Sequence, residues 1–332
     1  MKSLQNNLPH YFQILKHKRI PNYIFAKYTS VSFDRNESTE QLWKLHHHTL
    51  LAPTMKDVLP KTSLLDLKIE LANRMYHNCN FCHHNCLIDR EKTEGFCKIQ
   101  EFYIASAFIH KGEESILVPS YTVFFSGCNF HCMFCQNYDI SQNPKKGKKA
   151  TEVNLTQLIS KLPDHIKNIN WVGGEPTPHL LFILESLKHL DIVLPQIWNS
   201  NMYCSQETMA LLDGIIDLYL TDFKFGNNTC AMNVSGVKKY WEVITRNHIT
   251  ALNQGDVLIR HLLLPSHLSC CSKKIIQWIG KHMQTSVVHI MDQYYPTYKS
   301  TCDTALNSTI SRKEYSYIMH FAEKHHLFLY ID

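Results

Sequence analysis

The sequence predicts an α/β fold built on a parallel sheet that is buried on both faces. From residue 121 onward, six short apolar runs alternate with amphipathic, helix-type segments. Apolar strands that are each followed by a helix are typical of such sheets. Six units are too few for a closed eight-stranded barrel. The predicted strands are 121–126, 169–172, 192–198, 218–223, 257–264 and 287–291, and a seventh at 327–331 extends the edge.

Helix-start signals separate these strands. Ser, Thr and Asn favour the N-cap position, and Pro is tolerated in the first turn of a helix. The predicted starts are Asn154, Thr177 with Pro178, Ser205, Ser272 and Ser311. Asn154 and Ser311 are each followed three residues later by Gln or Glu, which is the capping-box pattern.

Composition indicates an ordinary globular protein. The chain has 332 residues, of which 44% are hydrophobic and 19% charged, enough for one barrel-sized domain with an appendage. Its formal net charge of +5 is mild for this length, so nucleic acid is not an expected partner. We expect a helical or irregular segment at 1–70, a cysteine-rich metal module at 71–118 and the main α/β domain at 119–332.

No apolar stretch is long enough to span a bilayer, and residues 1–20 lack the apolar core of a signal peptide. We therefore expect a soluble, cytoplasmic protein without a membrane partner. A mitochondrial-type presequence stays open, because residues 1–33 contain no acidic residue, although Arg19 is their only arginine. Twelve cysteines in such a chain indicate metal sites and reduced thiols rather than disulfides.

Three cysteines with CxxxCxxC spacing, Cys128, Cys132 and Cys135, directly follow the first predicted strand. A [4Fe-4S] cluster normally takes four thiolates, so a set of three leaves one iron open to another ligand. An open metal site indicates chemistry rather than a structural role. A zinc knuckle with a distant fourth ligand and a set of buried, unreactive thiols are the alternatives.

A second set consists of Cys79, Cys82, Cys86 and Cys97. Four thiols complete a site, so the set predicts either an auxiliary [4Fe-4S] cluster or a closed zinc site. We favour the cluster, because zinc sites tend to use two CxxC pairs and only one is present; His83 and His84 are possible substitutes. The adjacent Cys270 and Cys271 are expected to be buried thiols, with a redox pair as the alternative.

Polar and glycine-rich segments follow the other predicted strands. In parallel α/β folds reactive residues gather at the carboxyl ends of strands. The candidates there are Gly173, Gly174, Glu175, Asn199, Ser200, Asp222 and Arg260. Glycines allow close approach of backbone to a ligand, and Glu175 could accept from an ammonium group. A turn residue is the alternative for Asn199, and a strand-end ion pair is the alternative for Arg260.

Together these segments resemble the radical S-adenosylmethionine superfamily. Phe134, directly before the last cysteine of CxxxCxxC, matches an aromatic position that looks over the adenine in that family. Within the superfamily the chain is most similar to the PflX-type relatives of pyruvate formate-lyase activating enzyme. That resemblance extends over residues 75 to 295, through both cysteine sets and the segments 171–179, 198–203, 220–224, 259–262 and 291–294.

The resemblance implies a partial (β/α)6 barrel and a specific use of the site. In the family, the amino and carboxylate groups of S-adenosylmethionine bind the open iron, and one electron from the cluster yields methionine and a 5′-deoxyadenosyl radical. Gly173, Gly174 and Glu175 would bind the amino group. Asn199, Ser200, Asp222 and Arg260 would lie near the carboxylate, in some relatives around a monovalent cation. Asn199 is an amide where an acid is expected, so a cation site here is doubtful.

The sequence therefore predicts a radical enzyme that abstracts hydrogen from an unknown substrate, either a protein glycine or a small molecule. A flavodoxin- or ferredoxin-like electron donor is expected by the same resemblance. Two other functions remain open: a non-catalytic zinc or iron–sulfur regulatory module, motivated by the basic loop at 145–149, and a redox protein that passes electrons between two clusters.

Overall fold

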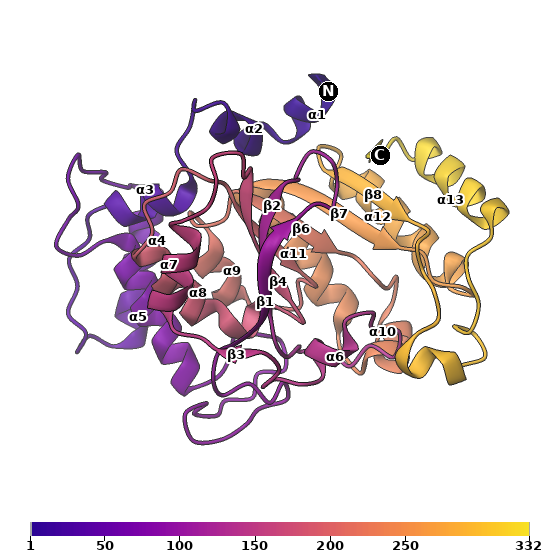
Figure 1. The fold of residues 1–332 in the computed structure, drawn as a ribbon, viewed down its shortest axis with the longest axis horizontal. Coiled ribbons are helices and arrows are strands. Elements are labelled where there is room, and N and C mark those ends of the chain that lie inside the picture. Colours follow the sequence, from indigo (N-terminus) through magenta and orange to yellow (C-terminus); the bar gives the residue numbers. More distant parts are fainter. Residues whose placement is uncertain (1, 332) are drawn as a thin grey trace.

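The structure, a computed structural model, describes residues 2–331 and is built on one continuous sheet (Figure 1). Its strand order is β3-β1-β2-β4-β5-β6-β7-β8-β9. The strands are β1 (Tyr103–His110), β2 (Ser120–Phe125), β3 (Lys148–Lys149), β4 (Asn168–Gly173), β5 (Gln196–Ser200), β6 (Leu218–Asp222), β7 (Asp256–Leu262), β8 (Val287–Met291) and β9 (Phe328–Leu329).

β2 and β4 to β9 pair in parallel, in the order in which they follow one another along the chain. Because right-handed crossovers then place every connecting helix on one side, the other side becomes concave. The covering helices are α7 (Glu152–Ile159), α8 (Leu180–Lys188), α9 (Gln206–Leu212), α11 (Tyr240–Gln254) and α12 (Lys273–His282). The predicted α/β class with a partial barrel is thus confirmed, as are the six strands and the edge strand.

Two edge strands were not predicted. β1 pairs antiparallel with β2, and the short β3 pairs antiparallel with β1. β1 falls inside the expected metal module, so residues of that segment belong to the main sheet. The division of the chain into three segments stays a prediction.

The helix starts at Ser205 and Ser311 are confirmed. The Ser205 side chain caps α9, and the Ser311 side chain caps α13 (Arg312–Lys324). Thr177 begins a 3-10 turn (Thr177–His179) that leads into α8. The predicted helix start at Asn154 was wrong, because α7 begins three residues earlier and Thr151 is its N-cap. α12 begins directly after Ser272, as predicted, but a π-helical turn (Leu268–Ser272) precedes it and the Ser272 side chain makes no capping hydrogen bond.

The N-terminal third adds a second layer of helices outside the barrel. α5 (Leu64–His77) packs against α8, and α3 (Asn22–Tyr28) and α4 (Thr39–Leu51) pack against α5, at the indigo and violet side of Figure 1. Capping boxes at Ser38 and Ser63 start α4 and α5. α8 is therefore buried on nearly all sides, which explains its continuous apolar sequence.

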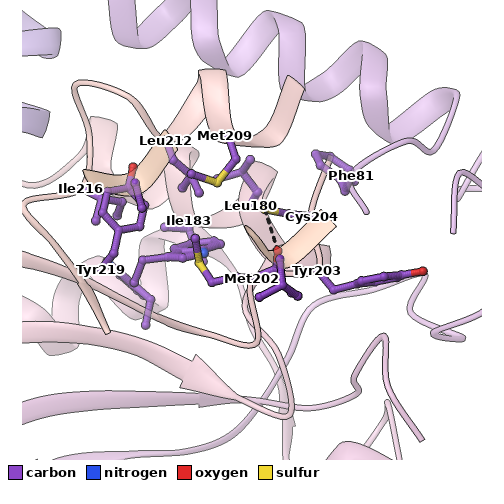
Figure 2. Packing of buried hydrophobic residues seen from close by; sticks show 14 of the residues in the cluster. Phe81, Leu180, Ile183, Met202, Tyr203, Cys204, Met209, Leu212, Ile216 and Tyr219 are labelled. Carbon is purple, nitrogen blue, oxygen red and sulfur yellow. Dashed lines mark hydrogen bonds between the residues drawn. The ribbon is translucent and has the colours of Figure 1, made fainter. Parts of the chain in front are cut away.

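The core is continuous from these outer helices to the sheet. Figure 2 shows Leu180 and Ile183 of α8 gathered with Met209 and Leu212 of α9 and with Tyr219 of β6. All five side chains are almost completely buried. Each such aliphatic side chain contributes about 1.5–3 kcal/mol through burial, and together they fix the strand ends in position.

The amino end of the chain closes the base of the barrel. α1 (Lys2–Asn7) and α2 (Pro9–Leu15) pack on a separate apolar cluster that includes Ile197, Leu220 and Leu258, one from each of three adjacent strands. The backbone N–H of Tyr11 donates to Asp256, the first residue of β7. This places α2 at the amino ends of the strands, so only the carboxyl ends stay open to form a site.

The remaining helices are α6 (Tyr138–Ser141) and α10 (Asn228–Ser235), with a further 3-10 turn at Tyr298–Cys302. α10 and α11 were not predicted. In residues 2–331, no helix combines the length and apolar character that crossing a membrane requires.

Candidate active site

A cavity of about 480 Å³ opens at the carboxyl ends of the parallel strands. Its lining contains ten of the eleven residues predicted for the open cluster and cofactor site: Cys128, Cys132, Cys135, Phe134, Gly173, Gly174, Glu175, Asn199, Asp222 and Arg260. Ser200 is not part of the lining but donates a hydrogen bond to Glu175. Residues from five successive strand ends therefore meet in one place, although they are up to 132 positions apart in sequence, from Cys128 to Arg260.

The CxxxCxxC loop leaves β2 through a glycine in the left-handed region. Gly127 has φ +87°, and a Cβ there would lie 2.5 Å from the Ile99 side chain, so no other residue fits without rearrangement. The loop then rests on α10: the N–H groups of His131 and Met133 donate to the carbonyls of Ser235 and Val234. The cysteines are thus held by backbone contacts independent of any metal.

Each of the three thiols has a polar neighbour. The N–H of Phe130 donates to Cys128 Sγ at 3.3 Å, Ser235 Oγ lies 2.9 Å from Cys132 Sγ, and Ser141 Oγ lies 3.2 Å from Cys135 Sγ. Burial raises the pKa of Cys132 to about 12, and burial also raises the pKa of Cys128 well above its ordinary value. Thiolates here consequently need a bound cation to be stable.

The spacing of the three sulfurs distinguishes between possible metals. Around one zinc ion, thiolates bound at about 2.3 Å lie about 3.8 Å from one another. Cys128, Cys132 and Cys135 do not form a group whose sulfurs all lie within 4.8 Å, although such groups exist elsewhere in residues 2–331. Within residues 2–331 these three sulfurs are therefore not drawn together as they would be around a single zinc ion.

The two glycines after β4 have a structural reason as well. A Cβ on Gly173, whose φ is +128°, would lie 2.2 Å from the Phe125 backbone, and one on Gly174 would lie 2.1 Å from the carbonyl oxygen of Gly127. Both glycines therefore permit β4 and the cluster loop to come together. They line the cavity because that close approach leaves their backbone facing it.

Glu175 is a buried carboxylate with a full set of donors. Its Oε1 accepts from the hydroxyls of Ser200 and Thr177, both at 2.6 Å, and its Oε2 accepts from the N–H of Asn201 at 2.9 Å. The side chain is 1% exposed, and burial raises its pKa despite these donors. A cationic ligand in the cavity would therefore stabilise its charged form.

Asp222, at the end of β6, pairs with Lys224 at the cavity wall. Burial alone would lower the pKa of Lys224, but the negative charge of Asp222 outweighs it and raises that pKa. Lys224 in turn opposes the effect of burial on Cys132. The pair brings a fixed positive charge beside the cysteine loop.

Arg260, at the end of β7, makes the strand-end ion pair considered above. Its guanidinium donates to both carboxylate oxygens of Glu114, and His289 Nδ1 lies 2.8 Å from the same carboxylate. Glu114 is buried, but the charge and hydrogen bonds of Arg260 hold its pKa well below the usual range. The geometry favours the ion pair over a free cation for Arg260.

Phe134 faces the cavity from the cluster loop. It is 6% exposed, and its ring centroid lies 6.1 Å from that of Tyr294, which follows β8. Met291 and Gln293 of the same β8 segment also line the cavity. Phe134 and the end of β8 thus line the same cavity.

Several lining residues were not among the predicted site residues: His110, Glu113, Glu114, Asn201, Lys224 and His289. His110 is the last residue of β1 and Glu113 and Glu114 follow it, and this antiparallel strand lacks the strand-then-helix pattern of the others. Lys224 was visible two positions after Asp222, where a lysine at a strand end could have been recognised as its partner.

The second cysteine set also converges. Cys79, Cys82, Cys86 and Cys97 line one small cavity with Arg90. No three of these thiols form a group with all sulfurs within 4.8 Å, which again differs from a zinc tetrahedron. Burial raises the pKa of Cys79 to about 11 and raises that of Cys82 further, while the positive charge of Arg90 opposes the shift at Cys79.

Arg90 is 1% exposed. Its Nε and Nη1 donate to the carbonyls of Ile99 and Pro178, but Nη2 has no partner in the described residues. A buried guanidinium N–H without a partner is costly unless an anion lies near it. The cavity beside it is therefore suited to a negatively charged group.

Comparison with known proteins agrees with this geometry. Residues 122–278 match the model of the radical SAM superfamily. An uncharacterized protein of Methanocaldococcus jannaschii is 41% identical over 98% of this chain and 99% of its own length. The chain belongs to the radical SAM superfamily.

More distant similarities cover parts of the fold. 7-Carboxy-7-deazaguanine synthase of Methanothermobacter thermautotrophicus is 37% identical over 23% of this chain and 31% of its own length. The crystal structure of Streptococcus suis SuiB bound to the precursor peptide SuiA superposes with a TM-score of 0.46 and 12% identity, and the match covers 87% of this chain and 59% of SuiB. That likeness is too distant to support a conclusion about function.

Proposed function

We propose that this protein is a radical S-adenosylmethionine enzyme that uses a [4Fe-4S] cluster on Cys128, Cys132 and Cys135 to start hydrogen abstraction from a substrate. The observation that carries the proposal is the convergence of these three thiols with Gly173–Glu175 and Asp222 on one cavity at the strand ends. Its volume of about 480 Å³ lies within the range of small-molecule sites, about 300–1,000 Å³.

When bound, the cluster supplies the electron that cleaves S-adenosylmethionine and releases a 5′-deoxyadenosyl radical. The chain's own residues bind and orient S-adenosylmethionine. Glu175 offers a buried negative charge to the amino group, and Ser200 and Thr177 hold that carboxylate in place. Lys224 offers a positive charge for a carboxylate, while Phe134 provides an apolar surface for the adenine. Arg260 keeps Glu114 charged at the cavity wall.

For the second set we propose an auxiliary [4Fe-4S] cluster rather than zinc. Four thiolates and a cluster together carry negative charge, and Arg90 with its free Nη2 faces the same small cavity. The wide spacing of the sulfurs supports the same choice. Arg90 would then donate to the cluster or to one of its thiolates.

The substrate is either a protein glycine, as for activating enzymes, or a small molecule, and the electron donor is flavodoxin- or ferredoxin-like. Both statements rest on the resemblance to the PflX-type relatives of pyruvate formate-lyase activating enzyme. We also expect a cytoplasmic enzyme.

The test is anaerobic iron and sulfide analysis with EPR of the reduced protein, with and without S-adenosylmethionine. We expect a cubane signal that changes when S-adenosylmethionine is added, together with formation of 5′-deoxyadenosine. Substitution of Cys128, Cys132 and Cys135 by Ala should abolish the response and lower product formation at least a hundredfold. About four iron atoms should remain, held by the second set.

Cys302→Ala is the matched control, because Cys302 is exposed and belongs to neither set. It should leave the iron content and the EPR response unchanged. Zinc as the sole metal, with no response to S-adenosylmethionine after full reconstitution, would contradict the proposal and favour the regulatory module.

A further inference from the structure

A third group of cysteines lies away from both predicted sites. Cys230 is on α10, and Cys270 and Cys271 are in the π-helical turn before α12. Cys270 Sγ lies 3.7 Å from Cys230 Sγ and 3.9 Å from Cys271 Sγ, and all three sulfurs lie within 4.8 Å of one another. The fold thus brings together thiols that are 40 residues apart in the chain.

These distances match the needs of one metal ion. Three thiolates bound at about 2.3 Å lie about 3.8 Å apart around a tetrahedral ion and about 4.0 Å apart around a trigonal one. A disulfide, in contrast, needs sulfurs at about 2.05 Å. The three thiols therefore stand at ligand distance without movement of the backbone.

The surroundings support thiolates. Asn227 Nδ2 lies 3.2 Å from Cys230 Sγ and 4.0 Å from Cys271 Sγ, and it also donates to the carbonyl of Cys270. Gly226 makes the closeness possible, because a Cβ there would lie 2.7 Å from Cys271 Cα. Cys271 is 1% exposed, whereas Cys230 and Cys270 are only partly buried. An ion can therefore enter from the side of Cys230 and Cys270.

We propose that Cys230, Cys270 and Cys271 form a three-thiolate site for a thiophilic metal ion of the Zn²⁺ type. Each thiol gives up its proton to the solvent as its sulfur binds, and no electron is transferred. A divalent ion leaves the site with a net charge of −1, and water at the partly exposed side provides the fourth ligand that zinc prefers. The ligands of this site are separate from those of the proposed radical chemistry.

Occupation of this site would stiffen the support of the cluster loop. α10 carries Cys230 near its start, and at its end Val234 and Ser235 accept hydrogen bonds from Met133 and His131 of that loop. A metal that ties α10 to the turn before α12 would therefore restrain the segment on which the CxxxCxxC loop rests.

The test is alkylation of cysteines in the cluster-loaded protein under anaerobic conditions, with and without one equivalent of Zn²⁺, followed by mass spectrometry of peptides. We expect Zn²⁺ to slow alkylation of Cys230 and Cys270 at least tenfold. Cys302, which is exposed, is the internal control and should react at the same rate in both samples.

Two variants sharpen the test. Cys230→Ser should remove the protection of Cys270 by Zn²⁺, and Cys270→Ser should remove that of Cys230. Equal alkylation rates with and without Zn²⁺ in the unmodified chain would overturn the proposal, as would recovery of Cys270 in a disulfide from protein kept under the same conditions.

Discussion

At the scale of single residues, the most constrained charges of the site are those of Glu114 and Arg260. Glu114 is buried and Arg260 is largely buried, and the guanidinium meets the carboxylate in a two-pronged arrangement that His289 completes. Such a pair contributes little beyond what apolar residues would, but removal of one partner leaves the other buried and unpaired. The pair therefore fixes the shape of the cavity wall more than it adds stability.

Glu114→Gln should lower the free energy of unfolding by up to about 3–5 kcal/mol, because Arg260 would keep only its longer contact with Glu113, at 3.8 Å. The pH dependence of the stability provides a second test of this ion pair. The pKa of Glu114 is lowered in the folded protein, so its contribution is present at neutral pH and is lost as the pH falls below the ordinary range of glutamate.

Urea unfolding at pH 7 and pH 4 measures both effects of Glu114→Gln. The difference in the free energy of unfolding between wild type and Glu114→Gln should be smaller at pH 4. Glu101→Gln is the control, since Glu101 forms an exposed pair with Lys149 and should change little. An equal loss for both variants would argue against the buried pair.

At the scale of elements, the sequence predicts those parts whose signal is local. The six parallel strands are almost completely buried on both faces, so apolar residues dominate their sequences, and motifs such as Gly173–Glu175 follow directly from their ends. The convergence of ten residues on one cavity was predictable because the carboxyl ends of parallel strands share one edge.

Other elements depend on contacts that a linear pattern does not carry. β1 is only partly buried and pairs with one long neighbour, so its pattern is weak. α10 was not predicted, although it supports the cluster loop and carries Cys230. The partner of Arg260 lies 146 residues away, which no local signal could indicate.

Gly174→Ala tests how closely β4 must approach the cluster loop. The added Cβ would lie 2.1 Å from the Gly127 carbonyl oxygen and 2.9 Å from Ser141 Cα, so backbone must move. We expect a loss of stability of about 1–3 kcal/mol and a lower iron content after reconstitution, because the shift reaches the loop that carries the cysteines.

Gly236→Ala is the control for this substitution. The added Cβ meets open space, so the only expected loss of stability is the cost of the left-handed φ of +72°, about 1 kcal/mol. The iron content of this variant should therefore equal that of the wild type. Equal iron contents in wild type and Gly174→Ala would show that the close approach does not control the loop.

At the scale of the whole molecule, two buried aspartates fasten the N-terminal helices to the base of the barrel. Asp256 accepts from the N–H of Tyr11 at 2.8 Å, and Asp217 accepts from the N–H of Asn22 at 2.8 Å. Both lie at the amino ends of strands, opposite the cavity. The amino ends of the strands thus hold the N-terminal helices, while the carboxyl ends form the cavity that can bind ligands.

This arrangement predicts a pH dependence opposite to that of Glu114. Burial raises the pKa of Asp256 to about 7, with Arg19 opposing the shift. A carboxyl whose pKa is raised in the folded state contributes stability below its unfolded pKa, and that contribution is lost as the pH rises through about 7. Between pH 5 and pH 8 the loss should be about 2–3 kcal/mol.

Asp256→Asn removes the titrating group while it keeps the shape of the side chain. The stability difference between wild type and this variant should therefore be larger at pH 5 than at pH 8, by about 2–3 kcal/mol, when measured by urea unfolding. Because Asp256 lies at the far end of the barrel, the affinity for S-adenosylmethionine should stay the same at both values. A difference that grows toward pH 8 would mean that the carboxylate, rather than the protonated acid, holds the N-terminal helices in place.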